Sequence, residues 1–234
     1  MVKNESYYVI GGGIIGLLCA RELINAGFPV TLFDRIEIGK ESSWAGGGIL
    51  SPLYPWRTNP AVNQLARISQ LLYPQICQEL TKKTAIDPQW EQSGLLVFGE
   101  KEHDNAIKWA LTASISLEII PSSNSAVYQE GIREDRQGML FLPHVAQVRN
   151  PRLLAALRQE LLLNGCHILE NTPITSISCK NNRLEAVCTQ NEIYSARYCI
   201  LAAGAWTPQL INPALSSIAI EPIRGQMLLL RSEI

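Results

Sequence analysis

The sequence lacks an excess of either charge. Its 234 residues include 20 Lys and Arg against 21 Asp and Glu, a formal net charge of −1, and no segment is rich in basic residues. Domains that bind nucleic acid carry a basic patch or stripe, so we expect no nucleic-acid partner. The hydrophobic content of 47% and the charged content of 18% are typical of a globular chain with one large domain or two modest ones.

Cysteine and histidine are too scattered to form a metal centre. No two of the six cysteines make a C-x-x-C pair, and none of the three histidines stands at metal-ligand spacing from them. We therefore expect no metal site and no disulfide framework, and we expect most of the cysteines to be buried thiols. The cysteines are Cys19, Cys77, Cys166, Cys179, Cys188 and Cys199.

No hydrophobic run is long enough to cross a membrane. The apolar run over residues 7–20 is shorter than the roughly 20 residues that a spanning helix needs. It could be the core of a signal peptide, but Glu5 weakens the basic region before it, and a signal peptide does not explain the glycines within the run. We expect a cytoplasmic protein without a membrane span.

Those glycines stand in an order of elements that is typical of a nucleotide site. A β-prone run over residues 7–10 leads into a G-x-G-x-x-G pattern over residues 11–16, and apolar residues at helical spacing follow. A second β-prone run over residues 28–33 ends at Asp34. Strand, glycines, helix, strand and acid in this order predict a βαβ unit that binds a dinucleotide.

Each glycine of the pattern has a separate task. Gly11 permits the tight turn, Gly13 lets the backbone approach a pyrophosphate, and Gly16 lets the helix pack closely on the strand. The phosphates would face the N-terminal end of the helix, and Asp34 would accept hydrogen bonds from the adenosine ribose. A purely structural tight turn is the alternative reading, and the motif alone does not separate NAD from FAD.

A later segment favours FAD. The apolar run over residues 198–201 is followed by Ala202, Ala203 and Gly204. In flavoproteins a second strand of this kind often returns to the same nucleotide site. A buried strand with a glycine turn is the alternative for this segment alone. Together with the first motif, it favours FAD over NAD.

A second glycine cluster suits the same cofactor. Only residues without Cβ leave room for backbone beside a flavin or its pyrophosphate, and residues 46–48 are all glycine. Ser42 and Ser43 can donate hydroxyls to phosphate, and the backbone N–H groups of the loop can face the flavin ring. Trp44 either shields the ring or simply packs.

Together these segments resemble the D-amino acid oxidase family of FAD-dependent amine oxidases, and within it the glycine oxidase branch that serves thiamine biosynthesis. The resemblance rests on residues 9–35, 42–52, 148–151, 172–174 and 202–206. The family usually has Glu where this chain has Asp34, which is a mild departure. The FAD contacts that the resemblance implies are Ile14, Ile15, Asp34, Arg35, Ser42, Ser43, Gly47, Gly48, Ile49 and the backbone of Ile174.

The resemblance also implies a fold and a division into domains. We expect an α/β fold, in which a Rossmann-like FAD-binding domain with a parallel sheet is interleaved with an incomplete antiparallel-sheet α+β substrate domain. The FAD-binding domain would comprise residues 1–88 and 148–213, and the substrate domain residues 89–147, with residues 214–234 starting a returning strand. The family's C-terminal third would then fall beyond Ile234.

Shorter elements are predicted from periodicity and turn residues. Within the helix expected over residues 62–84, Pro74 should introduce a kink or begin a new turn. Helices are expected over residues 62–84 and 103–114 and from Asn150 as N-cap to Gly165. Strands are expected over residues 94–98, 117–120, 138–142, 166–170, 174–179, 184–189, 198–201 and 218–230.

The activity implied by the resemblance is oxidative deamination of glycine or another small amino acid. A hydride would pass from the substrate carbon to flavin N5, and O2 would reoxidise the flavin and give hydrogen peroxide. This chemistry needs no general base, so we expect His103, His144 and His167 to be surface or structural residues, and we assign no catalytic residue.

Two alternatives stay open. The first is another oxidase or dehydrogenase of the family, acting on sarcosine or a D-amino acid. The second is a non-catalytic FAD-binding fragment, which could need a partner chain to supply missing strands. A homo-oligomer is a further expectation, and the electron acceptor and the amine are not defined by these residues.

Overall fold

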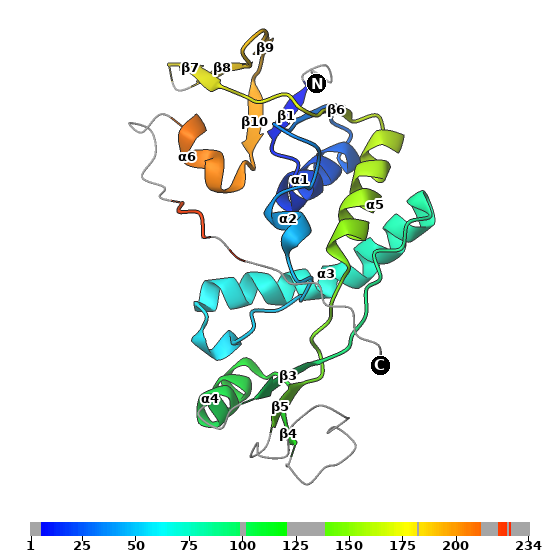
Figure 1. Cartoon of the computed structure of the whole chain (residues 1–234), viewed down its shortest axis with the longest axis vertical. Coiled ribbons are helices and arrows are strands. Elements are labelled where there is room, and N and C mark those ends of the chain that lie inside the picture. Colours follow the sequence, from blue (N-terminus) through cyan, green and yellow to red (C-terminus); the bar gives the residue numbers. More distant parts are fainter. Residues whose placement is uncertain are drawn as a thin grey trace. The chain divides into compact units, whose positions relative to one another are not determined.

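The computed structural model in Figure 1 describes residues 6–98, 102–120, 139–181, 183–211, 220–223 and 225. The chain forms two compact units, which are interleaved along the sequence. The first unit comprises Met1–Gly46, Lys83–Ile86 and Asn150–Ile234, and the second comprises Gly47–Lys82 and Asp87–Arg149.

A four-stranded parallel sheet forms the centre of the first unit. Its strands lie in the order β10-β1-β2-β6, and Tyr7 of β1 lies beside Val30 of β2 on one side and Tyr198 of β10 on the other. Because the strands are parallel, their carboxyl ends meet at one edge, where nucleotides bind in folds of this kind. The strands are β1 (Tyr7–Ile10), β2 (Val30–Phe33), β6 (His167–Leu169) and β10 (Tyr198–Leu201).

Two helices of this unit pack against each other, α1 (Ile14–Asn25) and α5 (Asn150–Leu163). Each is followed by a glycine in the left-handed region, Gly27 (φ +85°) after α1 and, as predicted, Gly165 (φ +78°) after α5. Asn150 is the first residue of α5 rather than a residue before it, a difference of one position at the helix end. The buried faces carry Leu17, Ala20, Leu153, Leu157 and Leu161.

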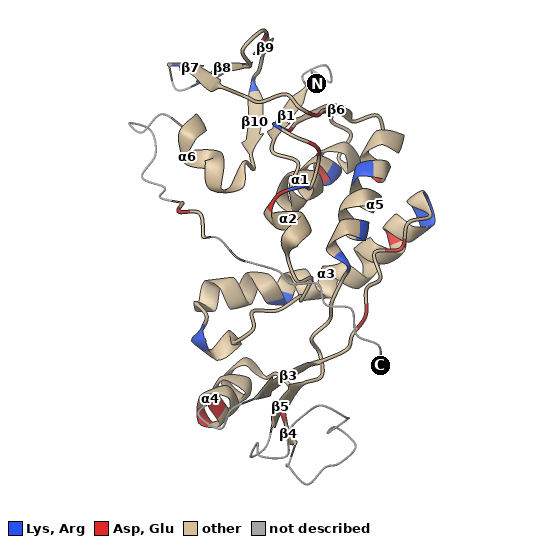
Figure 2. Cartoon of the chain, in the orientation of Figure 1, with Lys and Arg blue, Asp and Glu red and all other residues tan. Residues whose placement is uncertain are grey.

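A buried ion pair, Arg21 with Glu160, lies inside the first unit, and the half-exposed Lys83 joins it. Nε of Arg21 on α1 donates to Oε2 of Glu160 on α5 at 2.7 Å, and Nζ of Lys83 lies 2.7 Å from Oε1 of Glu160. The side chain of Glu160 is 1% exposed and that of Arg21 is 5% exposed. Each charge therefore needs its partner to offset the cost of removing it from water. Figure 2 shows Lys and Arg on α1, α3 and α5 rather than gathered on one element.

A second, antiparallel sheet of the first unit has the strand order β7-β8-β9. Val187 of β8 is fully buried and packs in a cluster with Ile10 of β1 and with Ala196. The strands are β7 (Ser176–Lys180), β8 (Arg183–Cys188) and β9 (Ile193–Ser195), and the short helices η3 (Gly204–Trp206) and α6 (Thr207–Leu210) follow β10.

The second unit contains a three-stranded antiparallel sheet in the order β3-β5-β4. Its core is a cluster of Val97, Ala106, Leu140, Leu142 and Val145, against which Trp56 and Trp109 pack. The elements are η1 (Pro55–Arg57), α3 (Pro60–Thr84), which ends in the first unit, β3 (Leu95–Phe98), α4 (His103–Ala113), β4 (Glu118–Ile120) and β5 (Met139–Leu142).

The predicted fold class is confirmed, with a parallel sheet, its helices and separate antiparallel sheets. Helix α3 continues through Pro74 from Pro60 to Thr84, so no new helix begins there. Strand β9 was missed, because it has only three residues, two of them exposed, and so leaves a weak pattern. The strand expected over residues 218–230 lies largely outside the described residues.

The compact units differ from the predicted domains mainly over residues 47–82, and by two residues each at 87–88 and 148–149. Residues 47–82 were expected in the FAD-binding domain, but the structure groups them with the second unit. Backbone hydrogen bonds explain this grouping, because the N–H of Leu50 donates to the oxygen of Ala146 and the N–H of Val148 donates to that of Gly48, both at 2.9 Å. The functional division into FAD-binding and substrate domains stays a prediction.

All six cysteines have free thiols, but fewer are buried than expected. Cys77 and Cys166 are buried, Cys179 is exposed, and the other three are intermediate. Among the described residues, no helix has both the length and the apolar character that a membrane crossing requires, and no group of three or more His, Cys, Asp or Glu in that part of the chain could hold a metal ion.

Candidate functional site: a dinucleotide cleft

The turn after β1 is held against the end of β10. The N–H of Gly11 donates to the oxygen of Phe33 at 2.8 Å, and the N–H of Ala202 donates to the oxygen of Ile10 at 2.8 Å. Gly11 has a φ of +107°, and a Cβ on it would lie 2.3 Å from the oxygen of Ala202. Glycine is therefore required here both by backbone conformation and by the close approach of Ala202.

The first turn of α1 also requires a glycine, at position 16. A Cβ on Gly16 would lie 1.8 Å from the oxygen of Gly11, so the first turn of α1 rests directly on the glycine turn. Gly13 precedes α1 in an extended conformation and contributes no side-chain cap, and the first turn contains no acidic residue. Apart from the N–H of Ile14, which donates to Oγ of Ser43, the N-terminal end of α1 therefore offers its backbone N–H groups and its positive dipole to an anion.

Asp34 is fixed at the tip of β2 by two backbone donors. The N–H of Gly12 donates to its Oδ2 at 2.6 Å, and the N–H of Ile36 donates to its Oδ1 at 3.0 Å. Each carboxylate oxygen has a second lone pair, so both oxygens keep acceptor capacity. An acceptor fixed beside the glycine turn fits the predicted contact with ribose hydroxyls.

The short helix α2 (Ser42–Ala45) brings serine hydroxyls to the same place. Oγ of Ser43 accepts a hydrogen bond from the N–H of Ile14 at 2.9 Å, in the first turn of α1. A hydroxyl that accepts one hydrogen bond still has its own proton to donate, as a phosphate contact needs. Trp44 is 49% exposed and borders another cavity, so it neither packs in the core nor lines this cleft.

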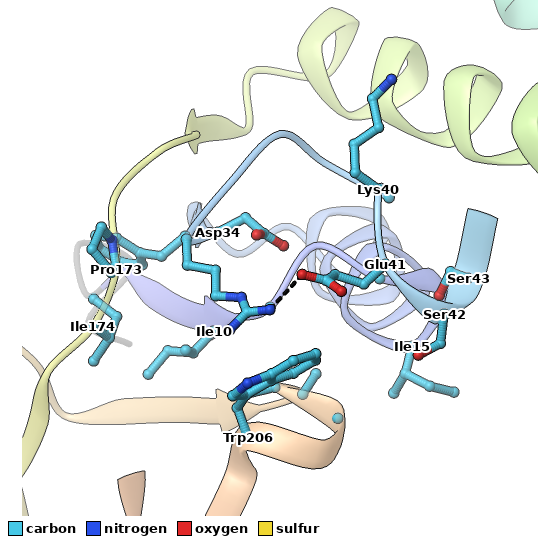
Figure 3. Close-up of a pocket in the computed structure, with 18 of the residues that line it drawn as sticks. Ile10, Ile15, Asp34, Lys40, Glu41, Ser42, Ser43, Pro173, Ile174 and Trp206 are labelled. Carbon is cyan, nitrogen blue, oxygen red and sulfur yellow. Dashed lines mark hydrogen bonds and ion pairs between the residues drawn. The ribbon is translucent and has the colours of Figure 1, made fainter. Parts of the chain in front are cut away.

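Arg35, the residue after the acid, lies between an aromatic ring and a carboxylate. Its guanidinium carbon is 3.6 Å from the centroid of the Trp206 ring, and it forms an ion pair with Glu41. The dashed line in Figure 3 marks this pair, with Trp206 below it. This arrangement was not predicted, because Trp206 is distant from Arg35 along the chain and no spacing rule links Arg35 to Glu41.

These elements enclose a cavity of about 380 Å³ within the first unit. Most of the predicted FAD contacts line it, whereas Gly16, which packs on Gly11, does not. Gly47, Gly48 and Ile49 are not among its lining residues and belong to the second unit. The predicted residues that line the cavity are Gly11, Gly13, Ile14, Ile15, Asp34, Arg35, Ser42, Ser43, Ile174, Ala203 and Gly204.

The residues present fit a dinucleotide. The Gly11 turn, packed on the backbone of Ala202, borders the cavity; the start of α1 suits a pyrophosphate, and Asp34 suits a ribose. These features define a Rossmann-type nucleotide-binding unit.

The chain belongs to the FAD dependent oxidoreductase family (DAO), whose model matches residues 6–234. It is 38% identical over 227 residues to the glycine oxidase of Pseudomonas aeruginosa, covering 97% of this chain and 62% of that protein. It is 29% identical to the bifunctional protein ThiO/ThiG of a Synechocystis species, covering 99% of this chain and 34% of that protein.

Solved structures show the same relationship. The crystal structure of glycine oxidase from Geobacillus kaustophilus superimposes with a TM-score of 0.80 at 25% identity, over 88% of this chain and 58% of that chain. Glycine oxidase from Bacillus cereus gives a TM-score of 0.79 at 25% identity, over 88% of this chain and 57% of that chain. The chain thus spans less than two thirds of the length of these relatives.

The predicted family and cofactor are confirmed. The family is FAD-dependent, so FAD rather than NAD is the dinucleotide that the two glycine motifs indicated. The individual contact residues stay predictions. Neither the serines nor Arg35 was assigned from spacing alone; their presence in the cleft follows from the packing of α2 and η3 around the end of β2.

Proposed function

We propose that this chain supplies the FAD-binding part of an oxidase that deaminates glycine or another small amino acid. The observation that carries the proposal is the cleft at the carboxyl ends of β1 and β2, where Gly11, Gly13 and Asp34 form a dinucleotide cradle. The similarity to glycine oxidases over 97% of the chain supports the choice of substrate class.

The roles of the residues follow from their positions. The start of α1 and the Ser42 and Ser43 hydroxyls would hold the pyrophosphate, and Asp34 would hold the adenosine ribose. Bound FAD supplies the two-electron oxidant for the amine. Gly47, Gly48 and Ile49 stay predicted contacts of the same cofactor.

The protein's residues contribute binding and exclusion of water rather than proton transfer. Ile10, Phe33, Ile174 and Leu210 give the cleft apolar walls, which exclude water from the bound cofactor. No acid or base is assigned to the reaction. O2 as electron acceptor, a homo-oligomer, a place in thiamine thiazole formation and a cytoplasmic location complete the proposal. They rest on the family resemblance and on the sequence features described above.

A non-catalytic FAD-binding fragment is not favoured, because the similarity to oxidases extends through both units of the chain. Another amine substrate would need a distinguishing feature among the described residues, and we identify none.

The experiment is reduction of the FAD-loaded protein under anaerobic conditions, read from its visible flavin spectrum. We expect glycine to bleach the flavin faster than equal concentrations of sarcosine or D-alanine, and air to restore the colour. Sarcosine or D-alanine acting faster would overturn the substrate assignment. A bound flavin that none of the three reduces would overturn the proposed activity of this chain while leaving FAD binding intact.

A further inference from the structure

Two loops on opposite sides of β1 meet at the dinucleotide cleft. Strands β10 and β2 flank β1, and the glycine turn follows β1 at its carboxyl end. Arg35 follows β2 and Trp206 follows β10, and the guanidinium carbon of Arg35 lies 3.6 Å from the centroid of the Trp206 ring. The contact therefore joins the two loops across the end of β1, and both residues line the cavity there.

Glu41 completes this contact from a third segment of the chain. Its carboxylate forms an ion pair with Arg35, above the ring of Trp206 in Figure 3, and it also lines the cavity. Glu41 directly precedes α2, but its side chain makes no capping hydrogen bond to that helix. The carboxylate thus serves Arg35 rather than α2. We call Arg35, Glu41 and Trp206 together the clasp.

The backbone is fixed at each residue of the clasp. Glu41 and Trp206 take part in backbone hydrogen bonds of 3.0 Å that form the turns of α2 and η3. Arg35 directly follows Asp34, whose carboxylate accepts hydrogen bonds from two backbone N–H groups. Opening the clasp therefore requires its side chains to rotate, while the loops that carry them keep their structure.

The charge of Glu41 would work against an anionic ligand if it were unpaired. Ser42, Ser43 and the start of α1 are placed to hold a pyrophosphate, and a free carboxylate beside them would repel that group. The ion pair with Arg35 cancels this charge and orients the planar guanidinium on the Trp206 ring. The side chains of Arg35 and Glu41 are 39% and 41% exposed, so water and salt reach the pair and it opens easily.

From this arrangement we propose that the clasp controls how fast FAD enters and leaves the cleft. A dinucleotide seated on the glycine turn lies beneath the contact between Arg35 and Trp206, so it passes only while that contact is open. The clasp closes equally well over a filled and an unfilled cleft, so it sets both exchange rates and leaves the dissociation constant unchanged. The proposal rests on the binding of FAD in this cleft, which is part of the proposed function.

The test measures FAD association and dissociation separately, from stopped-flow flavin fluorescence after mixing and after dilution. Glu41→Gln should raise both rate constants by roughly two- to fivefold, the contribution typical of an exposed ion pair. Trp206→Leu should raise both by roughly threefold or more, because it removes the ring on which the guanidinium lies. Glu37→Gln is the matched control, since it removes the same charge and breaks the exposed pair with Lys40 but leaves the clasp intact.

Two further measurements show whether the clasp acts as one unit. Glu41→Gln combined with Trp206→Leu should exchange FAD no more than about twofold faster than the faster single variant, because both changes release the same guanidinium. Added salt should speed FAD dissociation more in the unaltered protein than in Glu41→Gln, because only the unaltered protein has the exposed ion pair to screen. Circular dichroism checks that each variant is folded.

The outcomes separate the clasp from the proposed oxidase activity. Faster dissociation with unchanged association would make these residues ordinary FAD contacts and would overturn the proposal, as would rates equal to those of Glu37→Gln. No saturable binding of FAD would overturn the clasp and the proposed function together. Faster exchange in both directions, with a bound flavin that glycine does not reduce, would support the clasp and overturn the oxidase activity alone.

Discussion

The backbone oxygen of Ala202 leaves no room for a side chain on Gly11, because a Cβ there would lie 2.3 Å from that oxygen. The close approach brings the ends of β1 and β10 together at the cleft. A glycine in the sequence motif and an alanine almost two hundred residues later are thus parts of one structural requirement.

Replacing Gly11 with alanine should damage both the fold and the cleft. We expect Gly11→Ala to lower the free energy of unfolding by roughly 1–3 kcal/mol, from overlap with Ala202 and from a φ that L residues avoid. Gly27→Ala is the matched control, because Gly27 also has positive φ but has open space around it. Urea unfolding of both variants, followed by FAD titration, measures the two effects; equal losses in both would show that the approach of Ala202 does not matter.

The part of this site that the sequence predicted is the part governed by local rules. Gly11, Gly13, Gly16 and Asp34 stand at fixed spacings along one βαβ unit, so their grouping follows from chain geometry. Trp206 and Glu41 reach the cleft only through tertiary packing, and no spacing links them to Arg35. The residues between β2 and α5 were harder still to assign to a unit from sequence. Hydrogen bonds between distant segments, such as Leu50 to Ala146, decide which unit they join.

The two cations that pair with the buried Glu160, Arg21 and Lys83, should contribute very unequally to stability. We expect Arg21→Met to cost roughly 3–5 kcal/mol, because it removes the buried partner of a carboxylate that is 1% exposed. Lys83 is 46% exposed, so Lys83→Met should cost about 1 kcal/mol or less. Chemical denaturation compares the two, and similar losses would contradict the assignment of Arg21 as the main partner.

The Glu170 carboxylate should make stability depend on pH in the acid range. Hydrogen bonds from Arg158, and secondarily from the N–H of Ile38, lower the pKa of Glu170 below its ordinary value of 4.5. The contribution of Glu170 to the free energy of unfolding is therefore present above pH 4.5 and is lost as the pH falls through the lowered pKa of the folded state.

Because this pair is partly exposed, the effect should be small. We expect Glu170→Gln to be less stable than the unaltered protein by about 1 kcal/mol or less near neutral pH, with the difference closing in acid. Urea midpoints across the acid range measure it. A stability difference between the two proteins that grows as the pH falls would contradict a lowered pKa of Glu170.

Two thiols, Cys179 in β7 and Cys199 in β10, should differ in reactivity. Burial raises the pKa of Cys199 to about 12, whereas Cys179 is exposed. Since the thiolate is the reactive form, iodoacetamide should label Cys179 well before Cys199 in the native protein. Peptide mass spectrometry follows both sites, and labelling in urea is the control, in which the two rates should become similar. Faster native labelling of Cys199 would contradict its raised pKa.

The central claim is that the first unit binds FAD through its glycine turn and Asp34, and a flavin titration tests it most directly. FAD and FMN are titrated separately into the unaltered protein and into Asp34→Asn, with binding read from flavin fluorescence. Glu37→Gln, which neutralises an exposed acid of the same unit outside the cleft, is the control. The account predicts that FAD binds more tightly than FMN, which lacks the adenosine, and that Asp34→Asn weakens FAD by about tenfold or more while leaving FMN and the control unchanged. Equal binding of FAD and FMN, or FAD binding that is indifferent to Asp34→Asn, would contradict it.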